Sequence, residues 1–468
     1  MNDKDKKDKK FIGVKTNTYD GEVINHSVTL DISKCKGCTN CIKRCPTEAI
    51  RVRDNHAQIE NARCIDCGEC IRTCPYKAKK AIYDKFEDFE NYKYKIALPA
   101  PALYGQFEEL TDMDYLLTSL VECGFDEVFE VARAAEIASE YTRKFLEDNG
   151  PNSFPRPVIS SACPVVVRLI AIRYPLLREQ VLPVFAPIEI AARIAKKEVL
   201  EKHPELTPKD ICVLFISPCP AKVSYVKSPL GTSKSAVDGA LSISDVFFKL
   251  RSKINSIKEP YVDSKSGIIG ISWASTGGEA RALFNDKYLA ADGIENVIKV
   301  LDEIDNSNIR NVDFVELNAC SGGCVGGVLN IENPYIAKAR LQTLRRYLPV
   351  SMNRDNAGNI SYDWDEEISF DSVSKLSNDR REAMRKMREI EEISAKLPQI
   401  DCGSCGAPTC RALAEDIVKG RAKIENCVIV MRNRLVEFFR NHSEIDPDEL
   451  GLTDILENTS DKSESHEQ

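Results

Sequence analysis

Four cysteines of this chain follow apolar runs and stand in stretches rich in glycine or proline. They are Cys163, Cys219, Cys320 and Cys324. The last two belong to the sequence Cys-Ser-Gly-Gly-Cys-Val-Gly-Gly, shortly after an apolar run at 312–317 that has the composition of a buried strand. Glycine lets the backbone approach a bulky inorganic ligand closely. Four thiolates presented at three strand-to-loop junctions predict a cubane iron–sulfur cluster.

Eight further cysteines form two copies of the spacing Cys-x2-Cys-x2-Cys-x3-Cys-Pro, at 35–46 and 64–75. This run occurs in bacterial ferredoxins with two 4Fe-4S clusters, where the fourth cysteine of each run binds the other cluster. The expected ligands are Cys35, Cys38, Cys41 and Cys74 for one cluster, and Cys64, Cys67, Cys70 and Cys45 for the second. A zinc module is the alternative, although zinc sites rarely use this tandem spacing. Paired clusters relay single electrons, so this region predicts electron transfer without naming a reaction.

A last group of cysteines, near the C-terminus, has the spacing Cys-x2-Cys-x4-Cys-x16-Cys. Its members are Cys402, Cys405, Cys410 and Cys427. The stretch resembles the small 4Fe-4S domain of electron-transport and corrinoid-linked iron–sulfur proteins, because Gly403, Gly406 and Pro408 match its CGxCGxPxC pattern. A zinc knuckle is the alternative here too.

The composition, with 43% hydrophobic and 29% charged residues, is that of an ordinary water-soluble protein. The net charge of -8 argues against nucleic acid as a main partner. No run reaches the roughly 18 apolar residues of a membrane span, and the charged stretch 1–10 lacks the apolar core of a signal peptide. Because the cysteine spacings favour clusters over disulfides, we expect a reducing cytoplasm. Cys123 and Cys212 are then expected to be buried free thiols.

Between residues 87 and 370 the pattern alternates between strands and helices, which predicts parallel sheets with ligands beyond the carboxyl ends of the strands. Expected strands include 94–98, 126–131 and 267–271. Expected helices include 183–201, 242–253 and one that is capped by Thr111 and ends at Cys123.

We predict six segments, and a weak hairpin at 11–30. In order, the segments are a leader (1–28), an α+β ferredoxin domain with two 4Fe-4S clusters (29–86), an α/β catalytic domain (87–370), a charged helical linker (371–400), a small, mainly helical 4Fe-4S domain (401–445) and a disordered tail (446–468).

The middle segment, 94–345, resembles the catalytic domain of FeFe hydrogenases. That family has three motifs, TSCCP, MPCxxKxxE and ExMxCxxGCxxGG. The matching stretches here are Ser160-Ser-Ala-Cys163-Pro164, Ser217-Pro-Cys219-Pro-Ala-Lys222 and Glu316-Leu-Asn-Ala-Cys320-Ser-Gly-Gly-Cys324-Val-Gly-Gly327. The resemblance implies an oxidoreductase that reversibly splits H2 into protons and electrons.

The resemblance also implies roles for individual residues. The four thiolates would hold the 4Fe-4S half of the H-cluster, and Cys324 would bridge to a di-iron unit that carries CO, cyanide and a dithiolate amine. Lys222 would donate to one cyanide. The residues expected to contact the rest of the cofactor are Ala100, Pro101 and Ala102 in one loop, and Thr276 and Gly277 in the segment that matches the family's FGxTGG motif.

Cofactors and partners follow from the same resemblance. Three accessory 4Fe-4S clusters are expected beside the H-cluster. The expected partners are H2, the maturation proteins that install the di-iron unit, and a redox partner such as ferredoxin or a signalling protein. Neither nucleic acid nor a membrane is expected as a partner.

The chain departs from the family's pattern where protons move. The first cysteine of TSCCP, which passes protons to the cofactor, is replaced by Ala162. Other relay positions fall on Tyr141, Phe145, Leu182 and Tyr225, and altered pocket positions on Ser217, Asn318 and Ile188. Apolar side chains cannot transfer protons, and tyrosine, with a pKa of about 10, does so poorly near neutral pH.

Slow turnover follows from these replacements. Proton transfer by positioned side chains typically contributes about 10²–10⁴-fold to the rate. We therefore expect a slow enzyme, unless Glu136, Glu140 or Glu189 forms a substitute path.

Three interpretations stay open. Complete cluster ligands with an altered relay are typical of sensory hydrogenases, and the domain order resembles the group usually called D. The first interpretation is therefore a hydrogenase of low turnover that senses H2 or redox state, which Lys222 favours. The second is a multi-cluster electron carrier or iron–sulfur scaffold without the di-iron unit. The third is a fast hydrogenase with a rerouted proton path.

Overall fold

The computed structural model describes residues 26–108, 110–354, 360–368, 376–377 and 379–442. Most of the expected leader and hairpin, and the whole of the expected tail, lie outside these residues. The chain divides into two compact units. One unit joins Met1–Asp31 to Glu60–Ser372, and the other joins Ile32–Ile59 to Val373–Gln468. The six predicted segments therefore remain a proposal about boundaries.

The larger unit contains a four-stranded parallel sheet in the order β6-β5-β8-β9. The strands are β6 (Glu127–Val128), β5 (Tyr94–Pro99), β8 (Ile211–Ser217) and β9 (Gly239–Ser242). Strands β5 and β8 pair from Tyr94 opposite Ile211 to Pro99 opposite Ile216. Every residue of β8 is buried, as expected for a parallel strand covered on both faces.

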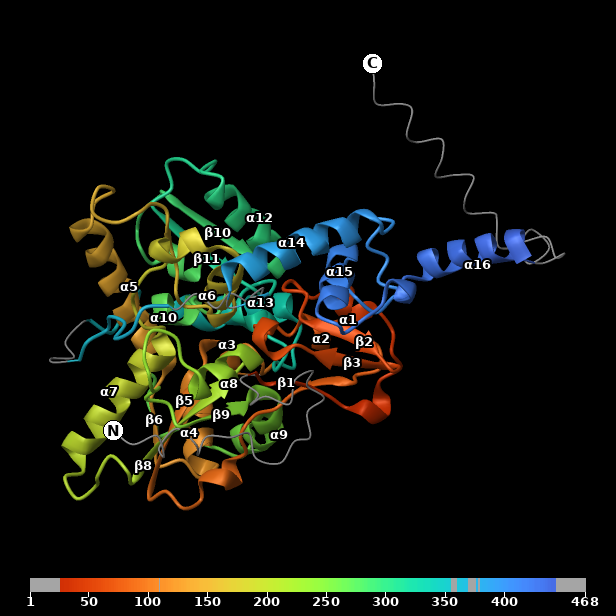
Figure 1. The fold of residues 1–468 in the computed structure, drawn as a ribbon. Helices are drawn as coiled ribbons and strands as arrows, with labels where there is room; N and C mark the ends of the chain where they lie inside the picture. The colour runs from red at the N-terminus through yellow and green to blue at the C-terminus, as the bar shows by residue number, and fades with distance from the viewer. Residues whose placement is uncertain (1–25, 109, 355–359, 369–375, 378, 443–468) are drawn as a thin grey trace. The chain divides into compact units, whose positions relative to one another are not determined.

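A second parallel sheet in this unit has the order β10-β11-β7, and Figure 1 shows β10 and β11 side by side. Its strands are β10 (Tyr288–Asp292), β11 (Phe314–Asn318) and β7 (Val158–Ile159). A short antiparallel pair, β1 (Val28–Leu30) and β4 (Lys79–Ala81), belongs to the same unit. The predicted α/β class with parallel sheets is confirmed.

Helices connect the strands of the larger unit. They are α2 (Glu69–Arg72), α3 (Pro101–Tyr104), α4 (Met113–Glu122), α5 (Val131–Asp148), α6 (Pro164–Arg173), α7 (Pro187–Lys202), α8 (Pro220–Lys227), α9 (Ile243–Ile254), α10 (Ile268–Ser272), α11 (Gly278–Arg281), α12 (Ile294–Asp305) and α13 (Pro334–Leu344). Among the described residues, no helix combines the length and the apolar character that a membrane crossing requires. Cys212 is fully buried in β8 as predicted, whereas Cys123, at the end of α4, is partly exposed.

Several predicted elements are wrong in type or at their ends. The run 267–271 forms the helix α10 instead of a strand, because five apolar residues are too few to distinguish the two periods. Gly270 places α10 against α5, since a Cβ there would lie 2.3 Å from the Ala132 carbonyl oxygen. The cap of α4 is Asp112, whose carboxylate accepts from the Asp114 N–H, and not Thr111. The expected strand at 126–131 is reduced to β6, because α5 already begins at Val131.

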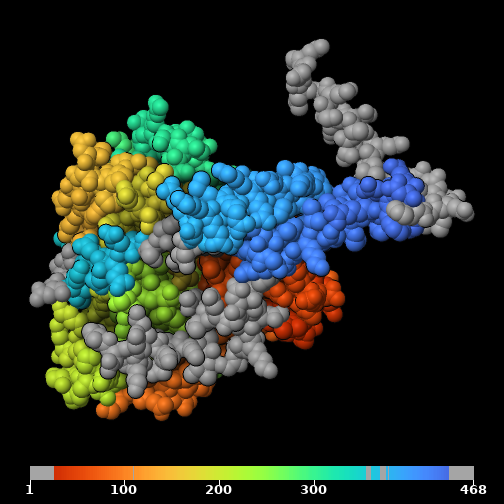
Figure 2. Space-filling view, viewed as in Figure 1, coloured from red at the N-terminus to blue at the C-terminus, as the bar shows by residue number. Residues whose placement is uncertain are grey.

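The smaller unit is a hairpin combined with helices. The helix α1 (Asn40–Lys43) precedes β2 (Ile50–Arg53) and β3 (His56–Ile59), which pair antiparallel. The C-terminal part contributes α14 (Arg380–Ala395), α15 (Cys410–Val418) and α16 (Val428–His442), so the predicted helical character of this region is confirmed. Ile390 is the one buried residue of α14. The rest of this helix is exposed or half-buried, and its segment is light blue in Figure 2.

A buried ion-pair network joins the two parts of the smaller unit. Arg51 Nε and Arg53 Nη2 lie 2.7 Å and 2.9 Å from Oδ2 of Asp416 on α15. The side chains of Arg51 and Asp416 are only 2% and 4% exposed. The Val52 N–H also donates to the Gly406 carbonyl oxygen at 2.8 Å. Residues of the first ferredoxin-type run and of the C-terminal cysteine group therefore fold together.

We expect Asp416→Asn to destabilise this unit by about 3–5 kcal/mol, because it leaves the buried guanidinium group of Arg51 and the half-buried one of Arg53 without their charge partner. Unfolding by denaturant, followed through the iron–sulfur absorbance, measures the change. The matched control is Glu415→Gln, which breaks a more exposed i,i+4 pair with Lys419 and should cost less than about 1 kcal/mol. Equal effects of the two variants would contradict the prediction.

Candidate active site

The strand-end cysteines lie where parallel strands of both sheets finish. Cys163 follows β7 and begins α6, Cys219 follows β8 and begins α8, and Cys320 follows β11. A proline occupies the first turn of α6 and of α8, where its missing N–H leaves no hydrogen bond unmade. The connectivity predicted from the strand and loop pattern is thus confirmed.

Glycine lets the loops of Cys219 and Cys324 approach each other. A Cβ on Gly327 would lie 2.2 Å from the Pro218 carbonyl oxygen. Gly323 has a φ of +91°, and a Cβ there would lie 2.6 Å from the Thr276 nitrogen. Any larger residue would push the loops apart, so the glycines predicted to admit a bulky ligand also hold the loops around it.

The four sulfur atoms are too far apart for one zinc ion. Four thiolates on zinc, each at about 2.3 Å from the metal, would lie about 3.8 Å from one another. No three of the sulfurs of Cys163, Cys219, Cys320 and Cys324 lie within 4.8 Å of one another. The same is true of Cys402, Cys405, Cys410 and Cys427.

The thiols near the cavity have altered acidity. Burial raises the pKa of the Cys163 and Cys320 thiols, and it raises the pKa of Cys219 to about 11 although nearby Lys222 lowers it. Without a metal these thiols are protonated at neutral pH. Binding of a cluster to them therefore releases protons.

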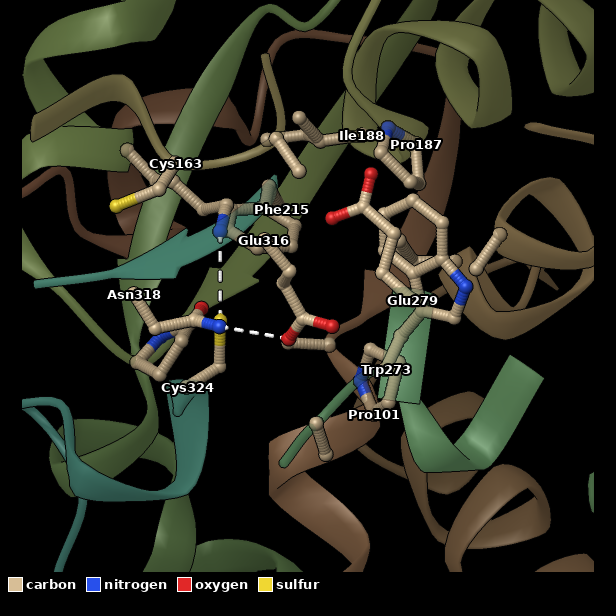
Figure 3. Close-up of a pocket in the computed structure, with 17 residues that line it drawn as sticks. Pro101, Cys163, Pro187, Ile188, Phe215, Trp273, Glu279, Glu316, Asn318 and Cys324 are labelled. Atoms are coloured by element: carbon tan, nitrogen blue, oxygen red, sulfur yellow. Dashed lines mark hydrogen bonds between the residues drawn. The ribbon is translucent and has the colours of Figure 1, made fainter. Parts of the chain in front are cut away.

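Lys222, on α8, points its ammonium group at Cys324. Its Nζ donates to the Cys324 Sγ over 3.7 Å (Figure 3). Burial works against the charged form, but the sulfurs of Cys324, Cys219 and Cys163 outweigh it and raise the pKa of Lys222 above its usual value. The ammonium group of Lys222 is therefore held at the Cys324 sulfur.

Lys222 and Cys324 open onto a cavity that residues from both sheets line together. Its wall is largely apolar, with Val131, Pro187, Ile188, Phe215 and Trp273 among the lining residues. The ionisable groups that reach it, apart from Cys163 and Cys324, are Lys222, Glu279 and Glu316. A positive charge and a thiol in an apolar chamber suit an anionic metal-bound ligand that must be kept from water.

The predicted pocket residues divide into two sets. Ala100 and Pro101, together with Ala162, line the cavity, whereas Ala102 is packed in the core. Thr276 and Gly277 do not line this cavity. Gly277 contacts a lining residue, because its N–H donates to Glu316 at 2.9 Å. Among the altered positions, Ile188 and Asn318 line the cavity, but Ser217 does not, and its hydroxyl donates to the Cys219 carbonyl oxygen.

The residues at the family's relay positions lie away from the cavity. The Tyr141 hydroxyl donates to the carboxylate of Asp363, and Tyr225 is buried. Phe145 packs edge-on against Phe154, and Leu182 is buried in the hydrophobic core. None of these four side chains lines the cavity.

The three acids considered as a substitute path lie elsewhere as well. Glu136 accepts hydrogen bonds from the backbone of Gly267, Met352 and Asn353. Glu189 accepts from Ser235 and Ala236, and Glu140 pairs with Lys144. Glu136 and Glu189 thus hold loops in place, and none of the three lines the cavity.

Two other glutamates, which the sequence did not single out as acids, project into the cavity (Figure 3). Glu279, on α11, accepts hydrogen bonds of 2.8 Å and 2.7 Å from the Ser160 hydroxyl, which in turn accepts from the Ala162 N–H. Glu316, on β11, accepts from the N–H groups of Gly277 and Ala280 and from the Asn318 side chain. Two carboxyl groups therefore reach the cavity that Ala162 also lines.

The two carboxyl groups are too buried and too close for both to ionise easily. Burial, followed by the charge of Glu316, raises the pKa of Glu279 to about 8. Burial also raises the pKa of Glu316, although its backbone hydrogen bonds lower it. A group that titrates near neutral pH is suited to carrying protons.

This raised pKa predicts a pH-dependent stability. An unfolded glutamate titrates near about pH 4.3, so between about pH 4.3 and 8 the folded state holds a proton that the unfolded state releases. The contribution of the Glu279 proton to the stability of the folded state is fully present below this pH window and is lost as pH rises through it. We expect the free energy of unfolding to fall by up to about 1.4 kcal/mol per pH unit between pH 5 and 8, and Glu279→Gln to flatten that slope. Denaturant titrations at constant ionic strength measure it, and an unchanged slope in the variant would contradict the assignment.

Family comparisons cover the three cluster-bearing regions. Residues 93–285 and 279–328 match the model of the iron-only hydrogenase large subunit, C-terminal domain. Residues 27–75 match a 4Fe-4S dicluster domain, which confirms the predicted ferredoxin-like region, and residues 397–429 match a model for iron–sulfur cluster sequences.

Individual relatives are more distant. Iron hydrogenase 1 of Clostridium pasteurianum is 24% identical over 291 residues, covering 50% of each chain. This chain thus spans about half the length of that curated relative. One component of the ion-translocating oxidoreductase complex of Thiobacillus denitrificans is 57% identical over 37 residues, which are 8% of this chain and 20% of that protein. An FeFe-hydrogenase structure from Chlamydomonas reinhardtii aligns at 19% identity with a TM-score of 0.43, covering 54% of this chain and 84% of that one.

Proposed function

Because this chain belongs to the family of the iron-only hydrogenase large subunit, we propose that it reversibly splits H2 into protons and electrons at an H-cluster. We further propose that its turnover is low and that it acts as a sensor of H2 or redox state. The observation that carries the proposal is the fixed charge of Lys222 at Cys324, inside an apolar cavity that also holds a buried carboxyl pair.

The chain's own residues would hold the cofactor. Cys163, Cys219, Cys320 and Cys324 would bind the 4Fe-4S half, with Cys324 also bound to the di-iron unit. When bound, the di-iron unit supplies the heterolytic cleavage of hydrogen. Lys222 would donate to an anionic ligand of this unit, Ala100 and Pro101 would limit its position, and the apolar wall would exclude water.

Proton transfer would use the carboxyl pair. Glu279 reaches the cavity beside Ala162, and its raised pKa lets it both accept and release a proton near neutral pH. Glu316 is close enough to influence the charge of Glu279, so a negative charge on Glu316 would favour the protonated form of Glu279. This pair would replace the family's cysteine relay, less efficiently, which is consistent with low turnover.

Electron transfer would use three accessory 4Fe-4S clusters. Two would be held by the cysteines of the ferredoxin-type runs, paired as the spacing predicts, and the third by the C-terminal group. Electrons released at the H-cluster would pass to these clusters and then to a partner, either ferredoxin or a signalling protein. Maturation proteins would be needed to install the di-iron unit.

Infrared spectroscopy tests the proposal directly. Purified protein is supplied with the di-iron precursor, and spectra are recorded before and after exposure to H2. We expect CO and cyanide bands that shift under H2, with about 18 iron atoms per chain. Absence of these bands, with about 16 iron atoms in four cubanes, would overturn the proposal. It would favour the second candidate, an electron carrier or scaffold, which the apolar Ala162 and Ile188 in the cavity wall also suit.

Ala162→Cys is expected to raise hydrogen turnover several-fold, because it places a titratable group at the cavity beside Ser160 and Glu279. Turnover per loaded cofactor, normalised by the infrared bands, is the measurement. Ala162→Ser, which has a similar size but does not titrate near neutral pH, is the control. Equal rates in all three proteins would show that steps farther from the cavity limit the reaction.

A further inference from the structure

A second cavity of the larger unit lies behind the Thr-Gly-Gly segment and is lined by cations. Its lining includes Arg281 at the end of α11 and Lys338, Gln342 and Arg345 from α13 and the turn that follows it. Positions 338, 342 and 345 share one face of a helix, so their side chains reach the same space. The cavity measures about 470 Å³ including its open mouth, and its lining contains no carboxylate.

In the part of the chain that the structure describes, these positive charges have no ion-pair partner. Arg281 is exposed, whereas Lys338 and Arg345 are half-buried, and no ion pair among the described residues involves any of the three. Arg345 donates to the Ser272 hydroxyl. Burial and the charge of Arg281 both lower the pKa of Arg345, so the two guanidinium groups lie close enough to repel each other. Like charges gathered in one hollow of a chain with a net charge of -8 create a local positive potential that attracts an anion.

Uncharged groups add hydrogen-bonding capacity to the cavity. The hydroxyl oxygen of Thr276, a lining residue, is buried and lacks a hydrogen-bond partner among the described residues. Buried hydroxyls are normally hydrogen-bonded, so this one has unused capacity. The Arg281 guanidinium also extends over Gly277, where a Cβ would lie 2.9 Å from its Nη2. Guanidinium forks, an ammonium and a hydroxyl are the donors that bind tetrahedral oxyanions.

We propose that this cavity binds an oxyanion of phosphate size, either free or as the phosphate group of a larger ligand. Arg281 and Arg345 would donate to its oxygens from two sides, Lys338 would contribute charge, and the Thr276 hydroxyl would donate one further hydrogen bond.

An anion bound at this site would lie close enough to influence the carboxyl groups of the first cavity. The Thr276–Gly278 segment lines the second cavity on one side, while the Gly277 N–H donates to Glu316 on the other. Arg281 also acts electrostatically on Glu316. An anion that neutralises Arg281 would therefore change the charge seen by the carboxyl pair without entering the first cavity.

Isothermal titration calorimetry on the full chain with its iron–sulfur clusters tests the proposal and does not require the di-iron unit. Inorganic phosphate and adenosine diphosphate are titrated separately, with ionic strength held constant by sodium chloride. We expect saturable binding of one anion per chain, weakened about tenfold or more by Arg281→Gln and by Lys338→Gln, as for the loss of one charge-assisted hydrogen bond. Arg310→Gln, which removes an exposed arginine outside the cavity, should leave the affinity unchanged.

The two ligands distinguish the source of the phosphate group. Binding of phosphate alone identifies a free anion, and tighter binding of the diphosphate that excludes phosphate identifies a larger ligand. Absence of saturable binding by wild-type protein would overturn the proposal. An equal loss of affinity in Arg281→Gln and Arg310→Gln would also overturn it, because it would show only a general response to net charge. Unchanged iron content and circular dichroism confirm that each variant is folded.

Discussion

Glu279→Gln is expected to lower hydrogen turnover by about 10²–10⁴-fold, the usual contribution of a positioned proton carrier. The amide has almost the same shape as the carboxyl and can still accept from the Ser160 hydroxyl, so the cavity should keep its form. It cannot exchange a proton near neutral pH. The infrared bands of the loaded cofactor should therefore keep their intensity while turnover falls.

Glu140→Gln is the matched control, since Glu140 is a half-exposed acid on α5 that pairs with Lys144 away from the cavity. Its turnover should stay within about twofold of the wild type. Glu316 is less suitable for the same substitution, because both of its oxygens accept backbone N–H bonds and an amide would turn an NH2 group toward one of them. Wild-type turnover in fully loaded Glu279→Gln would place the proton path elsewhere.

Lys222→Met is expected to abolish retention of the di-iron unit while leaving the four cubane clusters in place. Methionine keeps most of the length of the side chain but removes the ammonium group that lies at Cys324. Without this charge the apolar cavity offers little to an anionic ligand. The CO and cyanide bands should be absent, and iron should fall by about two atoms per chain, from about 18 to about 16.

Lys299→Met, at an exposed position on α12, controls for the loss of one lysine and should load normally. Electron paramagnetic resonance of the reduced variant checks that the cubane clusters survive. Bands of wild-type intensity in Lys222→Met would show that Cys324 and the loop backbone hold the di-iron unit without the ammonium.

The strand-end cysteines could be placed from the sequence because the relevant information is local. Each follows an apolar strand and enters a loop whose glycine or proline restricts the backbone, and parallel strands bring such loops to one edge. Lys222 could be placed for the same reason, since α8 begins at the cysteine loop and fixes its distance from Cys219.

The carboxyl pair depends on long-range packing, which local patterns do not contain. Glu279 and Glu316 come from different elements, and only the packing of α11 against β11 brings them together. One signal was nevertheless present. Glu316 interrupts an apolar strand, and an acid at a buried position calls for a functional or structural partner. The error at 267–271 has a similar origin, since α10 forms where Gly270 can pack against α5 and not because of its own periodicity.

The ion pair between Arg51 and Asp416 has a consequence for how the chain is made. The two residues are 365 positions apart in the sequence. A ribosome that adds about 5–20 residues per second needs roughly 20–70 s to travel from one to the other. During that interval the hairpin of β2 and β3 has emerged without the helix that neutralises its buried arginine. The buried ion pair can therefore form only late in synthesis, after α15 has been made.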